Sequence, residues 1–270
     1  MRREEKKVAL VTGASKGIGA ALAGYLLGQG FVVYGTGRNP QAPGGHTSSA
    51  PTMLRMDITD PASVRNALAQ LLEKEGRIDL LVNNAGLHVV GVLETMPLSE
   101  FEKCWRTNCL GALLVSRAVA PWMKKQGGGH IINISSVGGT LGLPFQGAYS
   151  ASKFALEGLS ESLRAELGSF GIKVVLIQPG DIRHQDCRVE SPPPEEYAEV
   201  YKKVMRVAWD DEEKGYPPER LGPLIMKILA KKNPKLRYGF GSAFQRAVPT
   251  LKRLLPWGLF ERALRLYYKF

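Results

Sequence analysis

The two side chains best placed to do chemistry are Tyr149 and Lys153, which stand four residues apart in the segment YSASKFALEGLSESL. Leucines at 156, 159 and 163 have helical spacing, so the segment is predicted to be a helix. Residues four apart share one helix face, which lets the ammonium group of Lys153 approach the phenol of Tyr149. A nearby cation lowers the pKa of a tyrosine from about 10, and such a tyrosine can exchange a proton with a carbonyl or alcohol oxygen. Because Tyr-x-x-x-Lys also occurs by chance in helices, the pair needs support from the rest of the chain.

A glycine-rich turn near the N-terminus provides that support. It follows the apolar run Val8–Val11, contains Gly13, Gly17 and Gly19 in TGASKGIG, and leads into an Ala- and Leu-rich helical pattern. Free N–H groups and the dipole at a helix N-terminus favour a pyrophosphate. The spacing G-x-x-x-G-x-G differs from the commoner G-x-G-x-x-G, and a plain strand-to-helix connection is the alternative. Its place after the first strand favours nucleotide binding.

Together these features resemble the short-chain dehydrogenase/reductase family in its single-domain form, from about residue 7 to 182. The matching motifs, in chain order, are TGASKGIG (12–19), NNAG (83–86), Asn108 in RTNCLGALL, ISSVGG (134–139), YSASK (149–153) and PG (179–180). The segment around YSASK is most similar to the branch that holds 17β-hydroxysteroid dehydrogenases and related retinol and acyl-ketone reductases. The resemblance implies reversible hydride transfer between a nicotinamide and a ketone/secondary alcohol pair.

Elements that could position these residues alternate along the chain. Strand-like runs at Val8–Val11, Phe31–Tyr34, Met53–Met56, Ile78–Val82, Ile131–Ser135 and Val174–Ile177 are separated by helical patterns. This alternation predicts an α/β fold, a doubly wound parallel sheet of the Rossmann type with helices on both faces. The resemblance implies about seven strands in one NAD(P)-binding domain, residues 1–270. We also expect a substrate lid at about 181–216 and a basic, apolar, helical C-terminal extension at about 241–270.

The resemblance implies four catalytic residues, namely Asn108, Ser136, Tyr149 and Lys153. Tyr149 would give a proton in reduction and take one in oxidation, and Lys153 would also hold the nicotinamide ribose. Ser135 and Ser136 end one strand and point to opposite sides; the family spacing selects Ser136 as the residue that bonds the substrate oxygen. Asn108 would complete a proton relay through a water near Lys153.

A larger set of residues would hold the cofactor. Glycines and their neighbours form the pyrophosphate turn, Asp57 bonds the adenine, and the PG pair passes close to the nicotinamide. In NNAG the asparagines also stabilise the central sheet of this family. The set is Gly13, Ser15, Lys16, Gly17, Ile18, Gly19, Arg38, Asp57, Ile58, Asn84, Ala85, Gly86, Tyr149, Lys153, Pro179, Gly180 and Ile182. The three cysteines show no metal-ligand spacing, so no metal site is expected.

The end of the second strand predicts NADP(H) in preference to NAD(H). NAD enzymes of this family place an acid there, but this chain has Gly37 with Arg38 beside it. An arginine can bind a phosphate through two hydrogen bonds, and Ser15 and Lys16 add a hydroxyl and a second cation. One position departs from the family pattern, because His184 stands where a threonine usually contacts the nicotinamide. Imidazole can donate or accept a hydrogen bond, so that contact is left open.

The charge of the chain is concentrated at its C-terminal end. The whole chain carries +11, and residues 216–270 hold twelve Lys or Arg against two Asp or Glu, a net +10. The last part, FQRAVPTLKRLLPWGLFERALRLYYKF, mixes these cations with Leu, Trp, Phe and Tyr. It is interpreted as a helical cap with a solvated basic face or as a subunit contact. The alternative is a basic amphipathic element on an anionic membrane or beside a lipid-like substrate. No nucleic-acid motif accompanies the charge.

The predicted function is NADP(H)-dependent reduction of a bulky apolar ketone (a steroid, a retinoid or an acyl-lipid) with Tyr149 as general acid/base. The alternatives are a reductase of a 3-oxoacyl thioester or other small carbonyl, and a non-enzymatic NADP-binding regulator. The N-terminus lacks an apolar signal core, and no run reaches about 18 apolar residues. We therefore expect a cytoplasmic protein, with contact to a membrane only at its periphery. Family resemblance implies a homodimer or a tetramer.

Overall fold

A parallel sheet of seven strands forms the centre of the computed structural model, which describes residues 6–39, 50–183 and 188–270. The strand order is β3-β2-β1-β4-β6-β7-β9. Because the order reverses between β1 and β4, the sheet is doubly wound, as predicted, and ligands bind beside such a switch point. The strands are β1 (Val8–Val11), β2 (Val32–Gly37), β3 (Thr52–Arg55), β4 (Leu80–Asn83), β6 (Gly129–Ile134), β7 (Ile172–Pro179) and β9 (Arg237–Phe240).

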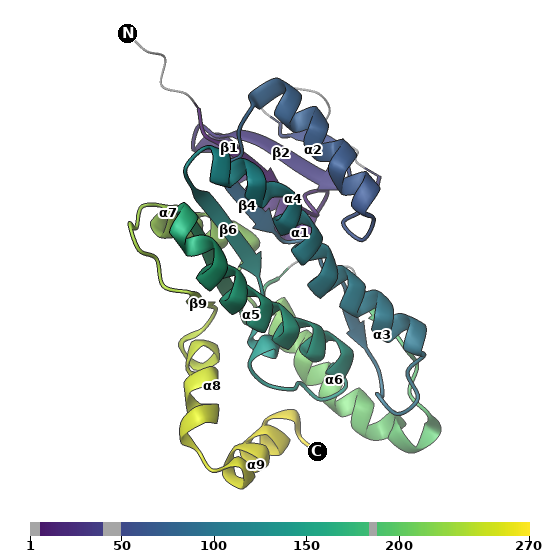
Figure 1. Cartoon of the computed structure of the whole chain (residues 1–270). Helices are drawn as coiled ribbons and strands as arrows, with labels where there is room; N and C mark the ends of the chain where they lie inside the picture. The colour runs from purple at the N-terminus through teal and green to yellow at the C-terminus, as the bar shows by residue number, and fades with distance from the viewer. Residues whose placement is uncertain (1–5, 40–49, 184–187) are drawn as a thin grey trace.

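Helices cover both faces of this sheet (Figure 1). One apolar core packs the sheet against side chains such as Leu68, Val119 and Leu167, and the other against Leu22 and Ile225. A sheet covered on both faces needs strands that are apolar on both sides, which explains the continuous apolar runs in the sequence. The helices of the first face are α2 (Pro61–Glu75), α4 (Ala112–Lys125) and α5 (Gly147–Leu167), and those of the second are α1 (Gly17–Gly28) and α7 (Leu221–Leu229).

Residues 98–125 form one continuous helical stretch with an irregular turn inside it. Helix α3 (Leu98–Trp105) passes into a π-helical turn, η1 (Arg106–Gly111), and then into α4. Short 3₁₀ turns connect other elements, namely η2 (Val137–Gly139), η3 (Gly168–Phe170), η4 (Glu195–Tyr197) and η5 (Pro218–Arg220). A π turn inside an α-helix is frequently found at a functional site.

The segment expected to be a lid contains a strand and a helix. Strand β8 (Arg188–Glu190) pairs in parallel with β5 (His88–Val90), which follows the NNAG motif, and α6 (Ala198–Glu213) comes after it. Within the three described ranges, no helix is both long enough and apolar enough to cross a membrane.

The C-terminus is helical, as predicted, and consists of α8 (Ala243–Leu254) and α9 (Trp257–Tyr268). A capping box starts α8, since Ser242 accepts from the Gln245 amide and the Gln245 side chain accepts from the Ser242 amide. Figure 1 shows both helices (yellow) extending beyond the sheet on the side of β9. Buried Tyr268 joins α9 to α6 in a small apolar cluster with Val204 and Met205.

Candidate active site

A cleft of about 970 Å³ opens at the carboxyl ends of β1, β4, β6 and β7. This volume lies in the usual range for a small-molecule or cofactor site, about 300–1,000 Å³. Of the predicted site residues, Gly19 and Asn108 do not line it. The cleft brings together the rest, namely Gly13, Ser15, Lys16, Gly17, Ile18, Arg38, Asp57, Ile58, Asn84, Ala85, Gly86, Ser136, Tyr149, Lys153, Pro179, Gly180 and Ile182.

The glycine turn owes its shape to close packing against the NNAG segment. Gly13 and Gly17 have φ values of 66° and 56°, which favour glycine. A Cβ on Gly13 would lie 2.8 Å from the Cα of Ala85. A Cβ on Gly19 would collide with the carbonyl oxygen of Gly13. Gly19 therefore lets α1 pack against the turn and does not face the cleft.

Thr12 and Asn84 fasten this turn to the end of β4. The Thr12 hydroxyl oxygen accepts hydrogen bonds from the amides of Asn84 and Ala85, each 3.0 Å long. The Asn84 side chain donates to the carbonyl oxygens of Thr12 (2.9 Å) and Gly13 (3.3 Å). Asn84 thus holds the turn in place. Sequence reasoning missed Thr12, although it is the first residue of TGASKGIG.

Cations and a hydroxyl gather at the end of β2. Ser15, Lys16 and Arg38 are exposed at this end of the cleft. A Cβ on Gly37 would collide with the Ser15 hydroxyl, so the strand end has no room for an acidic side chain unless Ser15 moves. The end of β2 is therefore positively charged and can attract an anionic group.

Asp57 follows β3 at the same end of the cleft. Burial raises the pKa of its carboxyl group, but hydrogen bonds from the Thr59 amide (2.8 Å) and hydroxyl (2.7 Å) and the charge of Arg38 leave that pKa below its usual value. Asp57 is therefore ionised at neutral pH and can accept further hydrogen bonds.

Lys153 is buried beneath Tyr149 on α5. Its ammonium group donates to the carbonyl oxygen of Ile134 (2.8 Å) and lies 5.6 Å from the centre of the Tyr149 ring. Burial lowers the pKa of Lys153 to about 8, while the charges of Cys104 and Glu157 act in the opposite direction. Since this value is above 7, the amine is mainly protonated at neutral pH and supplies a positive charge beside Tyr149.

Ser136 and Tyr149 flank the same small space. A Cβ placed on Gly138 would lie 3.4 Å from both the Ser136 hydroxyl oxygen and the Tyr149 ring. The Ser136 hydroxyl also accepts a hydrogen bond from the Gly138 amide (3.0 Å). The Ser135 hydroxyl lies instead beside Gly139, since a Cβ on Gly139 would be 2.7 Å from the Ser135 hydroxyl oxygen. Of the two serines, Ser136 is therefore placed to meet a substrate oxygen next to Tyr149.

Asn108 lies behind the cleft, inside the π turn η1. Its carboxamide accepts from the Leu87 amide (2.7 Å) and donates to the Leu87 carbonyl (2.8 Å) and to the Ser152 hydroxyl (2.9 Å). Its oxygen and the Lys153 ammonium lie 3.3 and 3.9 Å from the position of a Cβ on Gly86. Asn108 thus fixes the backbone after NNAG and approaches Lys153 without lining the cleft.

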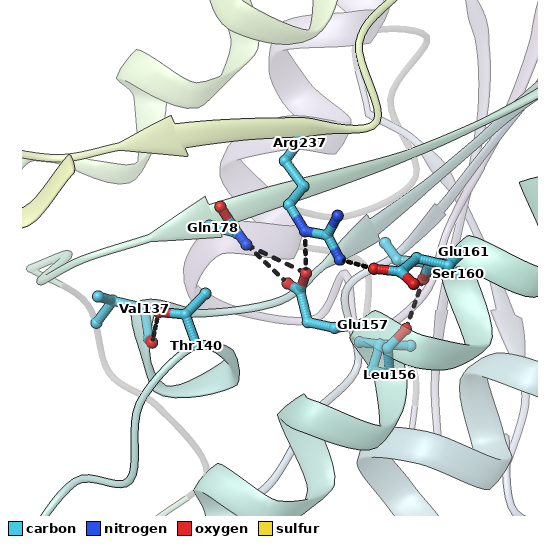
Figure 2. Close-up of polar contacts among 9 residues, drawn as sticks. Val137, Thr140, Leu156, Glu157, Ser160, Glu161, Gln178 and Arg237 are labelled. Atoms are coloured by element: carbon cyan, nitrogen blue, oxygen red, sulfur yellow. Dashed lines mark hydrogen bonds and ion pairs between the residues drawn. The ribbon is translucent and has the colours of Figure 1, made fainter. Parts of the chain in front are cut away.

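Figure 2 shows a polar network one helical turn beyond Lys153. Buried Glu157 accepts from the Arg237 guanidinium of β9 (2.7 Å) and from the Gln178 amide of β7 (3.1 Å to each oxygen). The Arg237 guanidinium also bonds Glu161 on the next turn of α5. The network fastens α5, and with it Tyr149 and Lys153, to the edge of the sheet.

His88 lines the cleft next to the catalytic tyrosine candidate and was not predicted. Its ring centre lies 4.5 Å from that of Tyr149, and its Nε2 is 2.7 Å from the side-chain oxygen of Gln146. Its place just after NNAG could have identified it, because residues beyond the carboxyl end of a strand line such clefts. His184, the possible replacement for the family's threonine, lies outside the described residues. Among the described residues no group of three metal-ligating side chains is found.

An apolar cavity of about 190 Å³ adjoins the cleft and shares His88, Gln146 and Asp181 with it. Its other walls come from elements far apart in the chain. They are Ala208 and Trp209 of α6, Phe244, Val248 and Leu251 of α8, and Phe260, Leu264, Tyr267 and Tyr268 of α9. Interpreting the C-terminus as a cap with a solvated face is therefore incomplete, since its apolar face encloses a space next to His88, whose ring packs against Tyr149.

Carboxyl groups stand where the cleft meets this cavity. Asp181 and Glu212 line both spaces. Burial, with added repulsion from Asp211 and Glu212, raises the pKa of Asp181 to about 6. Glu212 forms an ion pair with Arg188 (2.5 Å), and the Gln245 amide donates to Asp181. The junction thus holds two carboxyl groups against one cation, Arg188, and the cavity beyond it is mainly apolar, although Asp211 also lines it.

Comparisons with known proteins agree with this geometry. A family model described as short chain dehydrogenase matches residues 7–194. The chain is 40% identical to a 3-ketodihydrosphingosine reductase of Bacteroides thetaiotaomicron, over 98% of each chain. It is 33% identical to human 17-beta-hydroxysteroid dehydrogenase type 1, over 93% of this chain and 81% of that protein. The branch suggested by the YSASK segment is thus among its relatives.

Solved structures give the same result. A short-chain dehydrogenase from Streptomyces avermitilis has a TM-score of 0.82 and 31% identity, with 99% of this chain and 97% of that chain covered. A Burkholderia cenocepacia member binds NADP (TM-score 0.76, 27% identity, 96% and 97% covered). A Burkholderia phymatum member binds NAD (TM-score 0.73, 25% identity, 88% and 90% covered). The chain therefore belongs to the short-chain dehydrogenase/reductase family, oxidoreductases that act on CH–OH groups of small molecules.

Proposed function

We propose that the protein is an NADP(H)-dependent reductase that converts the ketone of a long-chain lipid to a secondary alcohol. The observation that carries this proposal is the apolar cavity that adjoins the cleft beside Tyr149. A substrate whose carbonyl group lies at Tyr149 could place an apolar chain between α6 and the α8–α9 pair. The volume of the cavity, about 190 Å³, is smaller than that of most ligand pockets, which favours an alkyl chain over a rigid ring system as its occupant.

The residues of the cleft would divide the work between orientation and proton transfer. The nicotinamide supplies the hydride, and the protein orients it and manages the proton. Tyr149 gives its phenolic proton to the ketone oxygen, while Ser136 donates a hydrogen bond to the same oxygen as it gains charge. The positive charge of Lys153 favours the phenolate that Tyr149 then becomes. Asn108 holds the adjoining backbone and completes the relay through a water.

Preference for NADP(H) follows from the charges at the end of β2. Arg38, Ser15 and Lys16 would bind the 2′-phosphate, and Gly37 places no carboxylate at the end of β2 itself, where NAD enzymes of this family have an acid. The dinucleotide pyrophosphate would lie at the N-terminus of α1, against Gly13 and Gly17, where free amides favour negative charge.

The acidic junction supports an amino-ketone as the substrate. The ketone named in the Bacteroides relative, 3-ketodihydrosphingosine, carries an amino group beside its carbonyl and a long alkyl chain. A protonated amine at that position would meet Asp181 and Glu212, and the alkyl chain would enter the apolar cavity. A steroid ketone is the second candidate, favoured by similarity to the human steroid dehydrogenase, but it offers no cation to these carboxylates.

Three further assignments complete the proposal. The described part of the segment 181–216, which contains β8 and α6, acts as a lid over the substrate within a single domain. Two subunits pair through the helices that hold Asn108 and Tyr149, where Leu110, Trp122 and Phe154 are exposed apolar side chains suited to such a contact. The enzyme acts in the cytoplasm, where NADPH is available.

The test is oxidation of NADPH, with NADH in parallel, against 3-ketodihydrosphingosine, its N-acetyl derivative, a steroid ketone and an acetoacetyl thioester. The expected result is turnover of 3-ketodihydrosphingosine with NADPH. Loss of the amine's charge in the N-acetyl derivative should cost about tenfold or more in kcat/KM, because a charge-assisted hydrogen bond contributes about 1.5–3 kcal/mol. Faster reduction of the thioester would overturn the lipid assignment. Tight NADPH binding without any turnover would favour the regulator hypothesis.

A further inference from the structure

The α8–α9 pair carries an unusual share of the exposed apolar surface. In the part of the chain that the structure describes, nine of fifteen exposed large apolar side chains lie between Phe244 and Phe270. Leu254 and Leu266 are 74% and 72% exposed, and Trp257 and Leu259 are 60% and 58% exposed. Exposed apolar surface concentrated in this way marks a place where a protein meets another molecule or a membrane.

Positive charge lies on the same two helices. Residues 243–270 contain six Lys or Arg and one acidic residue, Glu261, a net +5. Arg253 and Arg265 are exposed and stand next to the exposed Leu254 and Leu266 in the sequence. A helix with Leu and Trp on one side and Lys or Arg around them is typical of an element that lies in the interface of an anionic bilayer.

Charge and helix length argue against two other roles for this face, a contact with a second copy of the chain and a segment that spans a membrane. A second copy of the chain, paired through the same face, would bring +5 against +5. Each helix has 12 residues, fewer than the roughly 20 needed to span a bilayer. An anionic lipid surface is attractive to the cations and accepts the apolar side chains, so it matches both properties of the face.

The exposed face and the apolar cavity share a wall. Phe244, Leu251, Leu255 and Tyr267 are exposed and also line the cavity. An alkyl chain that left a bilayer beneath these helices would therefore reach the cavity, and through it Tyr149, with little passage through water. In Figure 1 the pair extends beyond the sheet, so the bulk of the domain does not cover it.

We propose that the α8–α9 face docks on the surface of an anionic phospholipid bilayer and that the substrate enters the cavity from that bilayer. Docking goes beyond the proposed function, whereas entry of the substrate rests on it. The cations bring the protein to the surface, and the exposed Leu and Trp side chains hold it there by burial among the lipid headgroups and upper acyl chains.

Flotation of the full chain with vesicles tests docking. The protein should float with phosphatidylglycerol-containing vesicles and much less with phosphatidylcholine vesicles. Added salt should reduce the fraction of protein that floats. The double variant Leu254→Glu, Leu266→Glu should float at least about tenfold less, because the exposed apolar anchors are replaced by anions. Leu98→Glu is the matched control, since Leu98 is 78% exposed on α3 and should change nothing. An unchanged thermal melt shows that each variant is folded.

Activity separates the two parts of the proposal. On a ketone held in phosphatidylglycerol vesicles the double variant should be at least about fivefold slower than the wild type, whereas on a short-chain, water-soluble amino-ketone both should react equally. A wild-type protein that stays at the bottom of the gradient overturns docking and leaves the reductase assignment standing. Docking is also overturned if this face is a dimer contact, which would give the double variant a lower solution mass than the wild type. If the soluble ketone does not react but the protein floats, the proposed function fails and docking stands.

Discussion

The two ends of the cleft are built in different ways. At the cofactor end, two short segments, TGASKGIG and NNAG, meet through backbone atoms and the side chains of Thr12 and Asn84. At the substrate end, side chains such as Trp209, Leu251 and Tyr268 come from helices that are distant in the sequence. The first end depends on local backbone shape, which a short motif encodes, and the second on long-range packing, which no short motif encodes.

Tyr149→Phe should have the largest effect, because it removes the reaction's proton donor and keeps the aromatic ring, with every residue of the glycine turn and of β2 unchanged. We expect kcat to fall by about 10²–10⁴-fold, the usual contribution of a general acid. NADPH binding, followed by its fluorescence, should remain within about twofold of the wild type. Near wild-type turnover of this variant would show that Tyr149 is not the acid.

Arg38→Glu should separate the two nicotinamide cofactors at the other end of the cleft. Loss of the guanidinium and the added negative charge should weaken the affinity for NADPH by about ten- to hundredfold, since a hydrogen bond to a charged group contributes about 1.5–3 kcal/mol. The affinity for NADH, which lacks the 2′-phosphate, should change little when measured by titration. Equal losses for the two cofactors would contradict the assignment of Arg38.

Asp181 should make the substrate end sensitive to pH. Its pKa, raised to about 6, means that the carboxyl group is ionised at pH 7 and becomes neutral as the pH falls below 6. The KM for a cationic amino-ketone should therefore rise as the pH falls, by up to about tenfold. The N-acetyl derivative has no cation and should not show this rise.

Asp181→Asn is the matching variant, because asparagine keeps the shape of the side chain and cannot ionise. It should have a high KM for the amino-ketone that no longer depends on pH in this range. A wild-type KM that is flat between pH 5 and 7 would show that the amine does not contact Asp181.

Glu157→Gln should have the smallest effect on activity at neutral pH. Glu157 raises the pKa of Lys153, so its loss should lower that pKa further below about 8 and move the alkaline limb of the kcat/KM profile to lower pH. It also removes the ion pair between the buried Glu157 carboxylate and the partly exposed Arg237 guanidinium, at a cost of about 1–2 kcal/mol of unfolding free energy. Glu161→Gln is the control, because Glu161 also pairs with Arg237 but does not perturb Lys153.

The central sheet and most of the cleft could be predicted because each strand is a continuous apolar run followed by a motif residue. Strand β9 was not located from the sequence, since Arg237–Phe240 is short and half-exposed at the sheet edge. Gly19 was predicted to hold the cofactor as part of the glycine turn; it does not line the cleft, and its lack of a side chain lets α1 pack against the turn. The cavity could not be predicted, because Trp209 and Tyr268 meet only through the packing of α6 against α9.

The π turn η1 sets a constraint on the length of the chain. A π turn holds one residue more than an α turn, so it rotates the helix after it by about 100° relative to an uninterrupted α-helix. Before and within the turn, Cys104 and Asn108 face Leu87; after it, Ser116 accepts a hydrogen bond from Asn83 on β4 (2.9 Å). Deleting a single residue between 106 and 111 would bring these two sets of contacts out of phase. Among homologous chains, this segment should accept substitutions while insertions and deletions are excluded.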